Sequence, residues 1–349
     1  MFCLLLCLLL TACAGRAQEQ QPAVTPLGPL SLLEARGTDF SDGRARFRQI
    51  FCAVLAEHGQ ARPNYRACDE ALAAGCPLPP ADGPPVHLGP SRQNFLIGLV
   101  PGFAWQCVRA WMNNDLSGIK HVARYGYEAQ LFEVDGLSSV KANGAQLAGH
   151  LAGKGERPVI LIGYSKGVPD ILAAVSQHPE VSRRVVAVVS VAGAVGGAPL
   201  ASRVKPSQAK LLSLIPLSGC EVGDNGALPS LAPERRRKWL AANRLPADIR
   251  YYSVISYPDQ DHISRGLKSS YRKLGGPQVA NDGQIPIPDQ LIPGSTLLAF
   301  VNADHWAMSV PVAHQMAFTR LTFGNKEGYP RDALLEAILR YVEEDLTGP

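Results

Sequence analysis

The sequence predicts an α/β protein with a doubly wound, mostly parallel sheet, and two observations carry that prediction. From residue 94 onward, short apolar runs of strand length recur, and segments with helical spacing lie between them. The runs are continuous rather than alternating, as is typical of strands buried on both faces. They are NFLIGLV (94–100), QLFEVDG (130–136), PVILIG (158–163), VVAVVSVAG (185–193), IRYYSVIS (249–256) and TLLAFVN (296–302). Such alternation favours an open sheet with helices on both faces.

The helical segments complete this main domain, which we expect to span residues 85–349. ANGAQLAGHLAG (142–153) and VPDILAAVSQ (168–177) have helical spacing, and the second ends at a His-Pro pair. A last helix is expected over residues 331–346. Residues 201–248 interrupt the alternation, so we expect them to form an inserted helical cap.

The N-terminal residues have the pattern of a leader. Residues 2–12 form an uncharged apolar run, roughly half of the ~20 residues that span a bilayer, which fits the core of a secretory signal. Leu10-Thr11-Ala12-Cys13 resembles the lipobox of bacterial lipoproteins. That resemblance implies a signal peptide over residues 1–12, lipidation of Cys13 and anchoring in the cell envelope, facing the periplasm or on the outer membrane. A plain secretory signal and a secreted protein are the alternative. Residues 13–40 are predicted to be a tether.

Residues 41–80 are predicted to form a helical hairpin ahead of the main domain. FRQIFCAVLAEHG and YRACDEALAAG have helical spacing, and Pro63-Asn64 separates them. Cys52 and Cys68 flank the predicted bend and are candidates for a disulfide; pairing of Cys68 with Cys76, or no bond, are the alternatives. No spacing of Cys and His residues suggests zinc, so no metal is expected.

Composition excludes several classes of protein. The chain has 349 residues, 46% hydrophobic residues and a net charge of +4, which excludes a disordered chain. The basic residues are scattered, apart from the short run Arg235–Lys238. We interpret this run as a solvated helix face, so no nucleic-acid partner is expected.

One strand runs directly into a motif that carries chemistry. PVILIG is followed by Gly163-Tyr164-Ser165-Lys166-Gly167 and then by a helical pattern. In this context the serine backbone is forced into a strained turn, and its hydroxyl and the next backbone N–H project to the same spot. The pattern favours Ser165 as a nucleophile; the alternative is an ordinary turn in which Ser165 caps the helix. The Lys166 side chain is expected to be solvated.

A serine nucleophile needs a base, and the base needs an orienting acid. His305 follows the last strand, in Ala303-Asp304-His305-Trp306, where such a base is expected. The candidate acids are Asp282 in an Asn-Asp-Gly turn, Asp259 and Asp261 after the strand at 249–256, and Asp304. Asp304 would point away from its neighbour in an extended loop. Chain order alone does not choose among the other three, and the tight turn favours Asp282.

Taken together, these motifs resemble the α/β-hydrolase superfamily, and in particular its bacterial lipase and esterase branch, over about residues 94–349. GYSKG resembles the nucleophile elbow, NDGQIPIPDQLIPG (281–294) the segment that supplies the acid, and ADHW the segment that supplies the histidine. VPGF (100–103) resembles the turn that supplies an oxyanion donor, with Pro101 where lipases usually have His. The resemblance implies a triad of Ser165, Asp282 and His305, with backbone N–H groups of Lys166 and Phe103 as the oxyanion hole.

The resemblance also implies the reaction, which is acyl transfer through an acyl-enzyme without a metal or organic cofactor. The apolar stretch LLSLIPLSG in the predicted cap suggests a small hydrophobic or lipid-like carboxylic ester as substrate. Two other functions stay open: an acyltransferase that uses the same triad, and a non-catalytic envelope lipoprotein that retains the fold.

Overall fold

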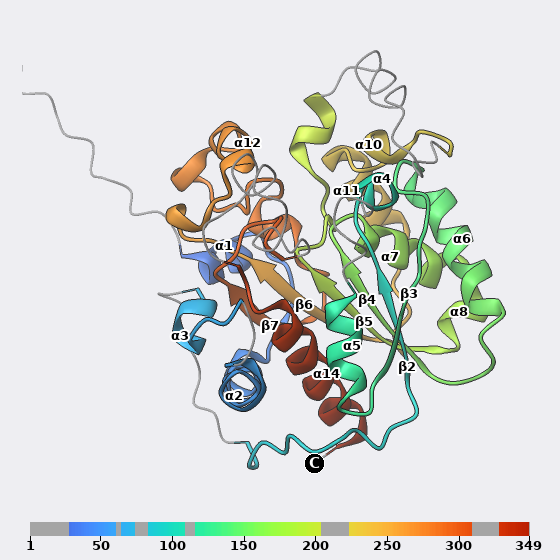
Figure 1. Cartoon of the computed structure of the whole chain (residues 1–349). Helices are drawn as coiled ribbons and strands as arrows, with labels where there is room; N and C mark the ends of the chain where they lie inside the picture. The colour runs from blue at the N-terminus through green and yellow to red at the C-terminus, as the bar shows by residue number, and fades with distance from the viewer. Residues whose placement is uncertain are drawn as a thin grey trace, which may run out of the picture.

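Parallel strands form the centre of the molecule in the computed structural model (Figure 1), which describes residues 28–60, 64–73, 83–108, 116–203, 223–308 and 328–348. Within these residues, one seven-stranded sheet has the order β1-β7-β6-β5-β4-β2-β3, and every neighbouring pair is parallel. The strands are β1 (Ser41–Asp42), β2 (Leu96–Val100), β3 (Glu128–Leu131), β4 (Val159–Tyr164), β5 (Val185–Val191), β6 (Arg250–Ser256) and β7 (Thr296–Val301). The predicted doubly wound α/β fold is confirmed.

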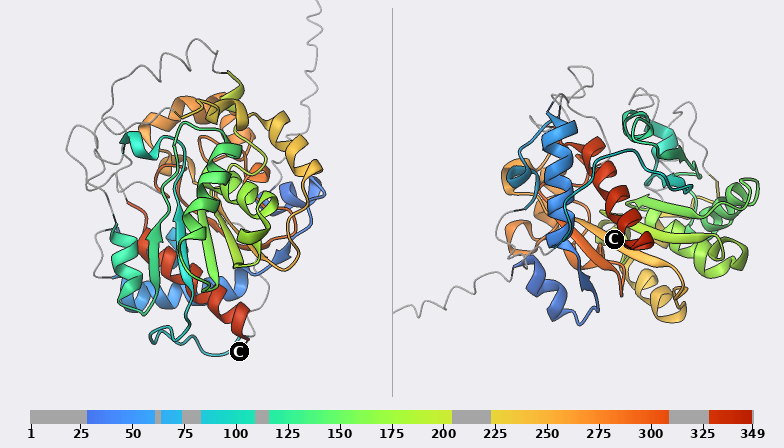
Figure 2. Two further views of the ribbon diagram at one scale, coloured as in Figure 1. Left: turned by 90° about the vertical axis from the view of Figure 1, so that its right-hand side faces the viewer. Right: turned by 90° about the horizontal axis from the view of Figure 1, so that it is seen from below.

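Helices cover both faces of the sheet (Figures 1 and 2). The longer ones are α2 (Arg44–Val54), α6 (Val140–Ala152), α7 (Gly167–Gln177), α11 (Pro233–Ala242) and α14 (Arg331–Thr347). The shorter ones are α1 (Pro29–Ala35), α3 (Cys68–Ala71), α4 (Trp105–Val108), α5 (Ser117–Ala123), α8 (Pro179–Ser182), α10 (Ala227–Ser230) and α12 (Lys268–Lys273). Helices α2, α5 and α14 pack together on one face, and α6 packs on α7 on the other.

Alternation along the central strands divides the core between these faces. In β4, Ile160 and Ile162 point into the cluster that contains α2 and α14, whereas Val159 and Leu161 point into the cluster that contains α6 and α7. Each face therefore needs apolar side chains, which explains why the strands are continuous apolar runs in the sequence.

The N-terminal segment contains two helices, α2 and α3, where the sequence predicted a helical hairpin, and it also adds a strand to the sheet. Residues 41–42 form β1 at the edge of the sheet, and α2 buries Phe47 and Phe51 in the same core as α14. The apolar face of α2 needs a partner, and β7 and α14 supply one, so α2 packs on the same sheet as the rest of the described chain. The expected tether at 13–40 is also shorter at its C-terminal end, because α1 lies within it and Leu33 is fully buried.

A disulfide joins Cys52 of α2 to Cys68 of α3, in the pairing that the spacing suggested first. Cys107 is disulfide-bonded as well, which the sequence analysis did not propose. Its partner is not among the described residues.

The predicted cap is described only in part, because residues 204–222, with the stretch LLSLIPLSG, lie outside the described residues. Its helix α11 packs Trp239 and Leu240 against the core on the α6 and α7 face. We had expected the whole run Arg235–Lys238 to be solvated, but Arg236 is only 1% exposed. Residues four apart lie on the same face of a helix, so Arg236 shares the inward face of α11 with Leu240.

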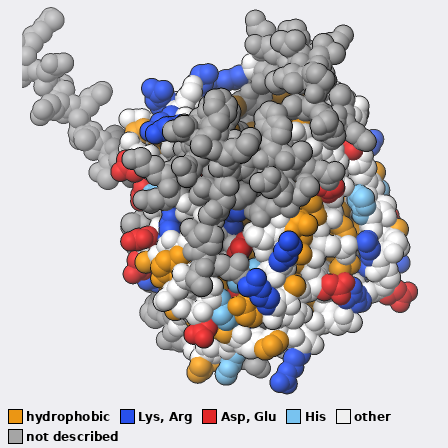
Figure 3. All heavy atoms as spheres, viewed as in Figure 1, with side chains coloured by type: hydrophobic (Ala, Val, Ile, Leu, Met, Phe, Trp, Pro, Cys, Tyr) orange, Lys and Arg blue, Asp and Glu red, His pale blue; other side chains and the backbone are white. Residues whose placement is uncertain are grey.

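The surface in Figure 3 carries Lys and Arg side chains interspersed with Asp and Glu side chains, in line with the scattered charges of the sequence. No helix in the described part of the chain is long and apolar enough to cross a membrane. The predicted signal peptide and Cys13 lie outside the described residues.

Candidate active site

The elbow after β4 holds Ser165 in a left-handed backbone conformation, with φ of 54°. Two glycines make this possible. A Cβ on Gly163 would lie 2.8 Å from the Val168 nitrogen, and one on Gly167 would lie 2.3 Å from the Val100 oxygen. Both distances are too short for any side chain, so the glycines of the motif are required by the close approach of backbone on either side.

Hydrogen bonds from the neighbouring strand hold the elbow on both sides of its Cα. The Ser165 N–H donates to the Val191 oxygen (3.2 Å) at the end of β5, and the Ser165 carbonyl accepts from the Ala194 N–H (3.0 Å). The segment after β5 therefore fixes the strained residue, which offsets its conformational cost.

The structure brings Ser165, His305 and Asp282 together at the carboxyl ends of the strands. The His305 Nε2 atom lies 2.9 Å from the Ser165 Oγ atom, and the His305 Nδ1 atom lies 2.7 Å from an Asp282 carboxylate oxygen. All three side chains are nearly excluded from water. With Nδ1–H donating to Asp282, the other ring nitrogen is free to accept the serine proton.

The Asn-Asp-Gly turn aims the acid, as the sequence suggested. One Asp282 oxygen accepts from the backbone N–H groups of Gln284 (2.9 Å) and Ile285 (2.7 Å), which leaves the other oxygen for His305. Gly283 has φ of +92°, a conformation that few other residues adopt. The backbone N–H of His305 donates to the Asp282 carbonyl (2.9 Å), so acid and base are tied through main chain as well.

The other candidate acids have different partners. Asp259 is largely exposed and accepts from the Asn302 side chain (2.8 Å), and Asp261 is exposed in the same turn. Asp304 is fully buried and points away from the imidazole; its oxygens accept from the backbone N–H groups of Ala307 and Ser264. Burial raises the pKa of Asp304, and the hydrogen bonds from Ser264 and Ala307 oppose that shift. Asp304 thus shapes the loop that presents His305.

Tyr164 is a site residue that the sequence analysis missed. Its hydroxyl donates to the His305 carbonyl, and the two rings lie 5.1 Å apart. Tyr164, at the end of β4, therefore helps to hold the loop that carries His305 in place. The only signal in the sequence was an aromatic residue inside the elbow motif.

The two expected oxyanion donors belong to Lys166, the residue after Ser165, and to Phe103 in a loop that passes close to Ser165. Lys166 occupies the N-cap position of α7, where backbone N–H groups have no partner within the helix. The loop after β2 passes so close that a Cβ on Gly102 would lie 3.0 Å from the Ser165 Cβ atom, and Phe103 follows directly. We had expected the Lys166 side chain to be solvated, but that expectation is wrong, because the side chain is only 1% exposed.

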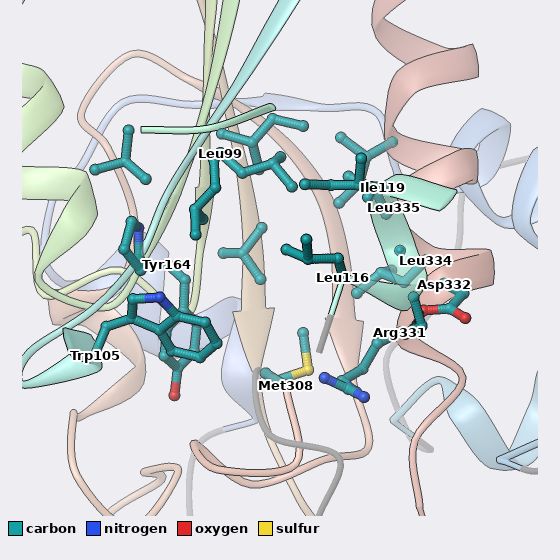
Figure 4. A pocket seen from close by; sticks show the side chains of 18 residues that line it. Leu99, Trp105, Leu116, Ile119, Tyr164, Met308, Arg331, Asp332, Leu334 and Leu335 are labelled. Carbon is teal, nitrogen blue, oxygen red and sulfur yellow. Dashed lines mark hydrogen bonds between the residues drawn. The ribbon is translucent and has the colours of Figure 1, made fainter. Parts of the chain in front are cut away.

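An apolar cavity of about 180 Å³ lies beside the elbow and the loop after β2 (Figure 4). Pro101, Tyr164 and Met308 line one part of it, and each lies within four residues of Ser165, Phe103 or His305 in the chain. The cavity continues between the sheet and helices α5 and α14, where Ile119 and Leu335 line it. Among the described residues, no group of three or more His, Cys, Asp or Glu side chains is placed to hold a metal ion.

The fold and this arrangement of Ser165, His305 and Asp282 are those of an α/β hydrolase. Neither a protein-family model nor a curated protein matches the sequence. Among solved structures, the metagenomic carboxyl esterase MGS0156 is 36% identical, with a TM-score of 0.83 over 92% of this chain and 96% of that one. The mature lipase BlEst2 of Bacillus licheniformis is 20% identical, with a TM-score of 0.52 over 76% of this chain and 95% of that one, and supports the fold. The chain belongs to the esterase and lipase family of α/β hydrolases, together with the metagenomic esterase.

We expect Asp282→Asn to lower kcat for an ester by roughly 10⁴-fold, because the amide keeps its shape but favours the wrong tautomer of His305. Asp259→Asn is the matched control and should keep most of the activity. Steady-state kinetics of both purified variants on a p-nitrophenyl ester make the comparison. The reverse pattern would make Asp259 the acid and leave Asp282 as a turn residue only.

Proposed function

We propose that the protein hydrolyses carboxylic esters through an acyl-enzyme formed on Ser165. The observation that carries this proposal is the buried chain of contacts from Ser165 to His305 (2.9 Å) and from His305 to Asp282 (2.7 Å). The activity of the related metagenomic protein, a carboxyl esterase, supports the same reaction for this family.

The geometry suggests the order of proton transfers. His305 takes the Ser165 proton as the serine oxygen attacks the ester carbonyl, and Asp282 stabilises the imidazolium that forms. The backbone N–H groups of Lys166 and Phe103 hold the oxyanion; one such donor is worth ~3 kcal/mol. His305 then protonates the leaving alcohol. In the second half, water loses a proton to His305 and attacks the acyl group, and Ser165 recovers its proton as the acid leaves.

The cavity beside Tyr164 suggests where the acyl group lies. Its walls are mostly apolar, with Leu99 from the sheet opposite Ile119 and Leu335 from the helices, and Ile162 of β4 also lines it. Burial of each CH₂ group in such a site contributes about 0.8 kcal/mol, so a hydrophobic acyl chain is favoured over a polar one. A hydrophobic or lipid-like ester is the substrate class that fits.

The leader supports a location in the cell envelope. Cys13 follows the lipobox-like segment, and several acyl chains on one residue anchor a protein more stably than a single chain. We propose a lipid-anchored protein whose hydrolase domain lies outside the cytoplasm.

Ser165→Ala should abolish labelling by a fluorophosphonate probe and ester turnover, because it removes the attacking oxygen. The melting temperature should change little, since only the hydroxyl is lost from a folded elbow. In-gel fluorescence and thermal denaturation measure the two effects. Full labelling of the alanine variant would contradict the assignment.

Leu335→Trp should shorten the acyl chain that the enzyme accepts, because the indole fills the part of the cavity farther from Tyr164 in Figure 4. Turnover of p-nitrophenyl octanoate should fall about tenfold while turnover of the acetate stays within about twofold. Leu335→Met conserves volume and is the control. If the tryptophan variant keeps the wild-type chain-length profile, the acyl group lies elsewhere.

Cys13→Ser should move the protein out of the membrane fraction, because an oxygen replaces the sulfur that receives the lipid. Fractionation followed by immunoblotting measures the shift, and Cys7→Ser in the same leader is the control. A Cys13→Ser variant that still fractionates with membranes would refute the anchor.

A further inference from the structure

A buried ion pair lies directly behind the nucleophile. The Lys166 ammonium group lies 2.9 and 2.8 Å from the two carboxylate oxygens of Asp170, one turn further along α7. Both side chains are only 1% exposed. The mechanism proposed above uses the backbone of Lys166 and leaves this pair without a role.

Two further elements converge on the same carboxylate. Asn143 of α6 donates its amide to Asp170 (2.9 Å), and the guanidinium of Arg236 from α11 exerts a favourable charge interaction on it. Burial raises the pKa of Asp170, and the interactions with Lys166, Asn143 and Arg236 oppose that shift. Burial lowers the pKa of Arg236 to about 10, so this side chain stays charged at neutral pH.

The second cation is tied back to the elbow through the main chain. The Arg236 Nε–H donates to the Val195 carbonyl (3.1 Å), and the neighbouring Ala194 N–H donates to the Ser165 carbonyl (3.0 Å). Trp239 packs under the guanidinium, 4.6 Å from it. Lys166 is attached to the elbow by its own backbone, so the cluster holds the elbow from two sides.

Stability alone does not account for such a cluster. Removing charges from water costs several kcal/mol per ion, and well-packed apolar side chains often do as well or better. The same chain contains a pair of similar type on the surface, Lys238 with Glu234 at 2.8 Å and four residues apart, with both side chains more than 70% exposed. The surface pair contributes little to stability and nothing to the site, which makes it a matched control.

We propose that Lys166, Asp170 and Arg236 are positioning residues that fix the elbow so that the Lys166 amide points at the oxyanion. This inference rests on the proposed esterase function. The ion pair with Asp170 holds the Lys166 side chain along α7. On the other side of the elbow, Arg236 of α11 holds the segment after β5 through its bond to Val195. An amide that is misplaced by a fraction of an ångström binds the ground-state carbonyl as before but stabilises the oxyanion less.

The test compares Lys166→Met, which keeps the backbone amide, with Lys238→Met. We expect Lys166→Met to lower kcat for a p-nitrophenyl ester about 10- to 100-fold, with KM within about twofold. The Ki of a trifluoromethyl ketone, which binds as an oxyanion adduct, should rise by the same factor as kcat/KM falls. Active-site titration corrects each rate for the fraction of folded enzyme, and Lys238→Met should match the wild type in every measurement.

A second variant covers the case in which Lys166→Met does not fold. Lys166→Met with Asp170→Asn and Arg236→Met removes all three buried charges and should restore the melting temperature without restoring kcat. Wild-type kcat per titrated site in either folded variant, with only the melting temperature changed, would overturn the inference. Failure of the wild type to form an acyl-enzyme would instead overturn the proposed function.

Discussion

The left-handed backbone of Ser165 is the constraint on which the rest of the site depends. This conformation costs a residue with a side chain on the order of 1–3 kcal/mol, yet it is what presents the hydroxyl and the next N–H together above the sheet. The structure holds it with glycines at both ends of the motif and with hydrogen bonds from Val191 and Ala194. The sheet therefore stabilises the strained backbone conformation of Ser165.

The parallel sheet also explains how groups far apart in sequence meet. Ser165 follows β4, and His305, 140 residues later, follows β7. Because every strand runs in the same direction, both residues emerge at the same edge. The acid comes from a loop between β6 and β7, where the backbone contact from His305 to Asp282 aligns the two segments. Tyr164 then links the nucleophile strand to the histidine loop.

The features that a local sequence pattern encodes could be predicted from the sequence. Ser165 and His305 sit next to long buried strands, and the turn residues around Asp282 mark a fixed backbone. Other parts depend on tertiary contacts that leave no local pattern. The two residues of β1 are too few to show any periodicity, and nothing in GYSKG or in Arg235–Lys238 tells which cation is buried. Lys166 faces inward because it pairs with Asp170, and Arg236 faces inward because it bonds to the Val195 carbonyl and interacts with the charge of Asp170, which only the folded chain shows.

Trapping the covalent intermediate decides whether ester hydrolysis proceeds through an acyl group on Ser165. The protein is mixed with a p-nitrophenyl ester, quenched with acid within the first turnover, digested and analysed by mass spectrometry. If Ser165 is acylated, p-nitrophenol should appear in a burst close to one equivalent, and the peptide that contains Ser165 should carry an acyl group, located on that serine by fragmentation. Ester turnover without a burst and with no acyl group on Ser165, or acylation of another residue at the rate of turnover, would contradict hydrolysis through Ser165.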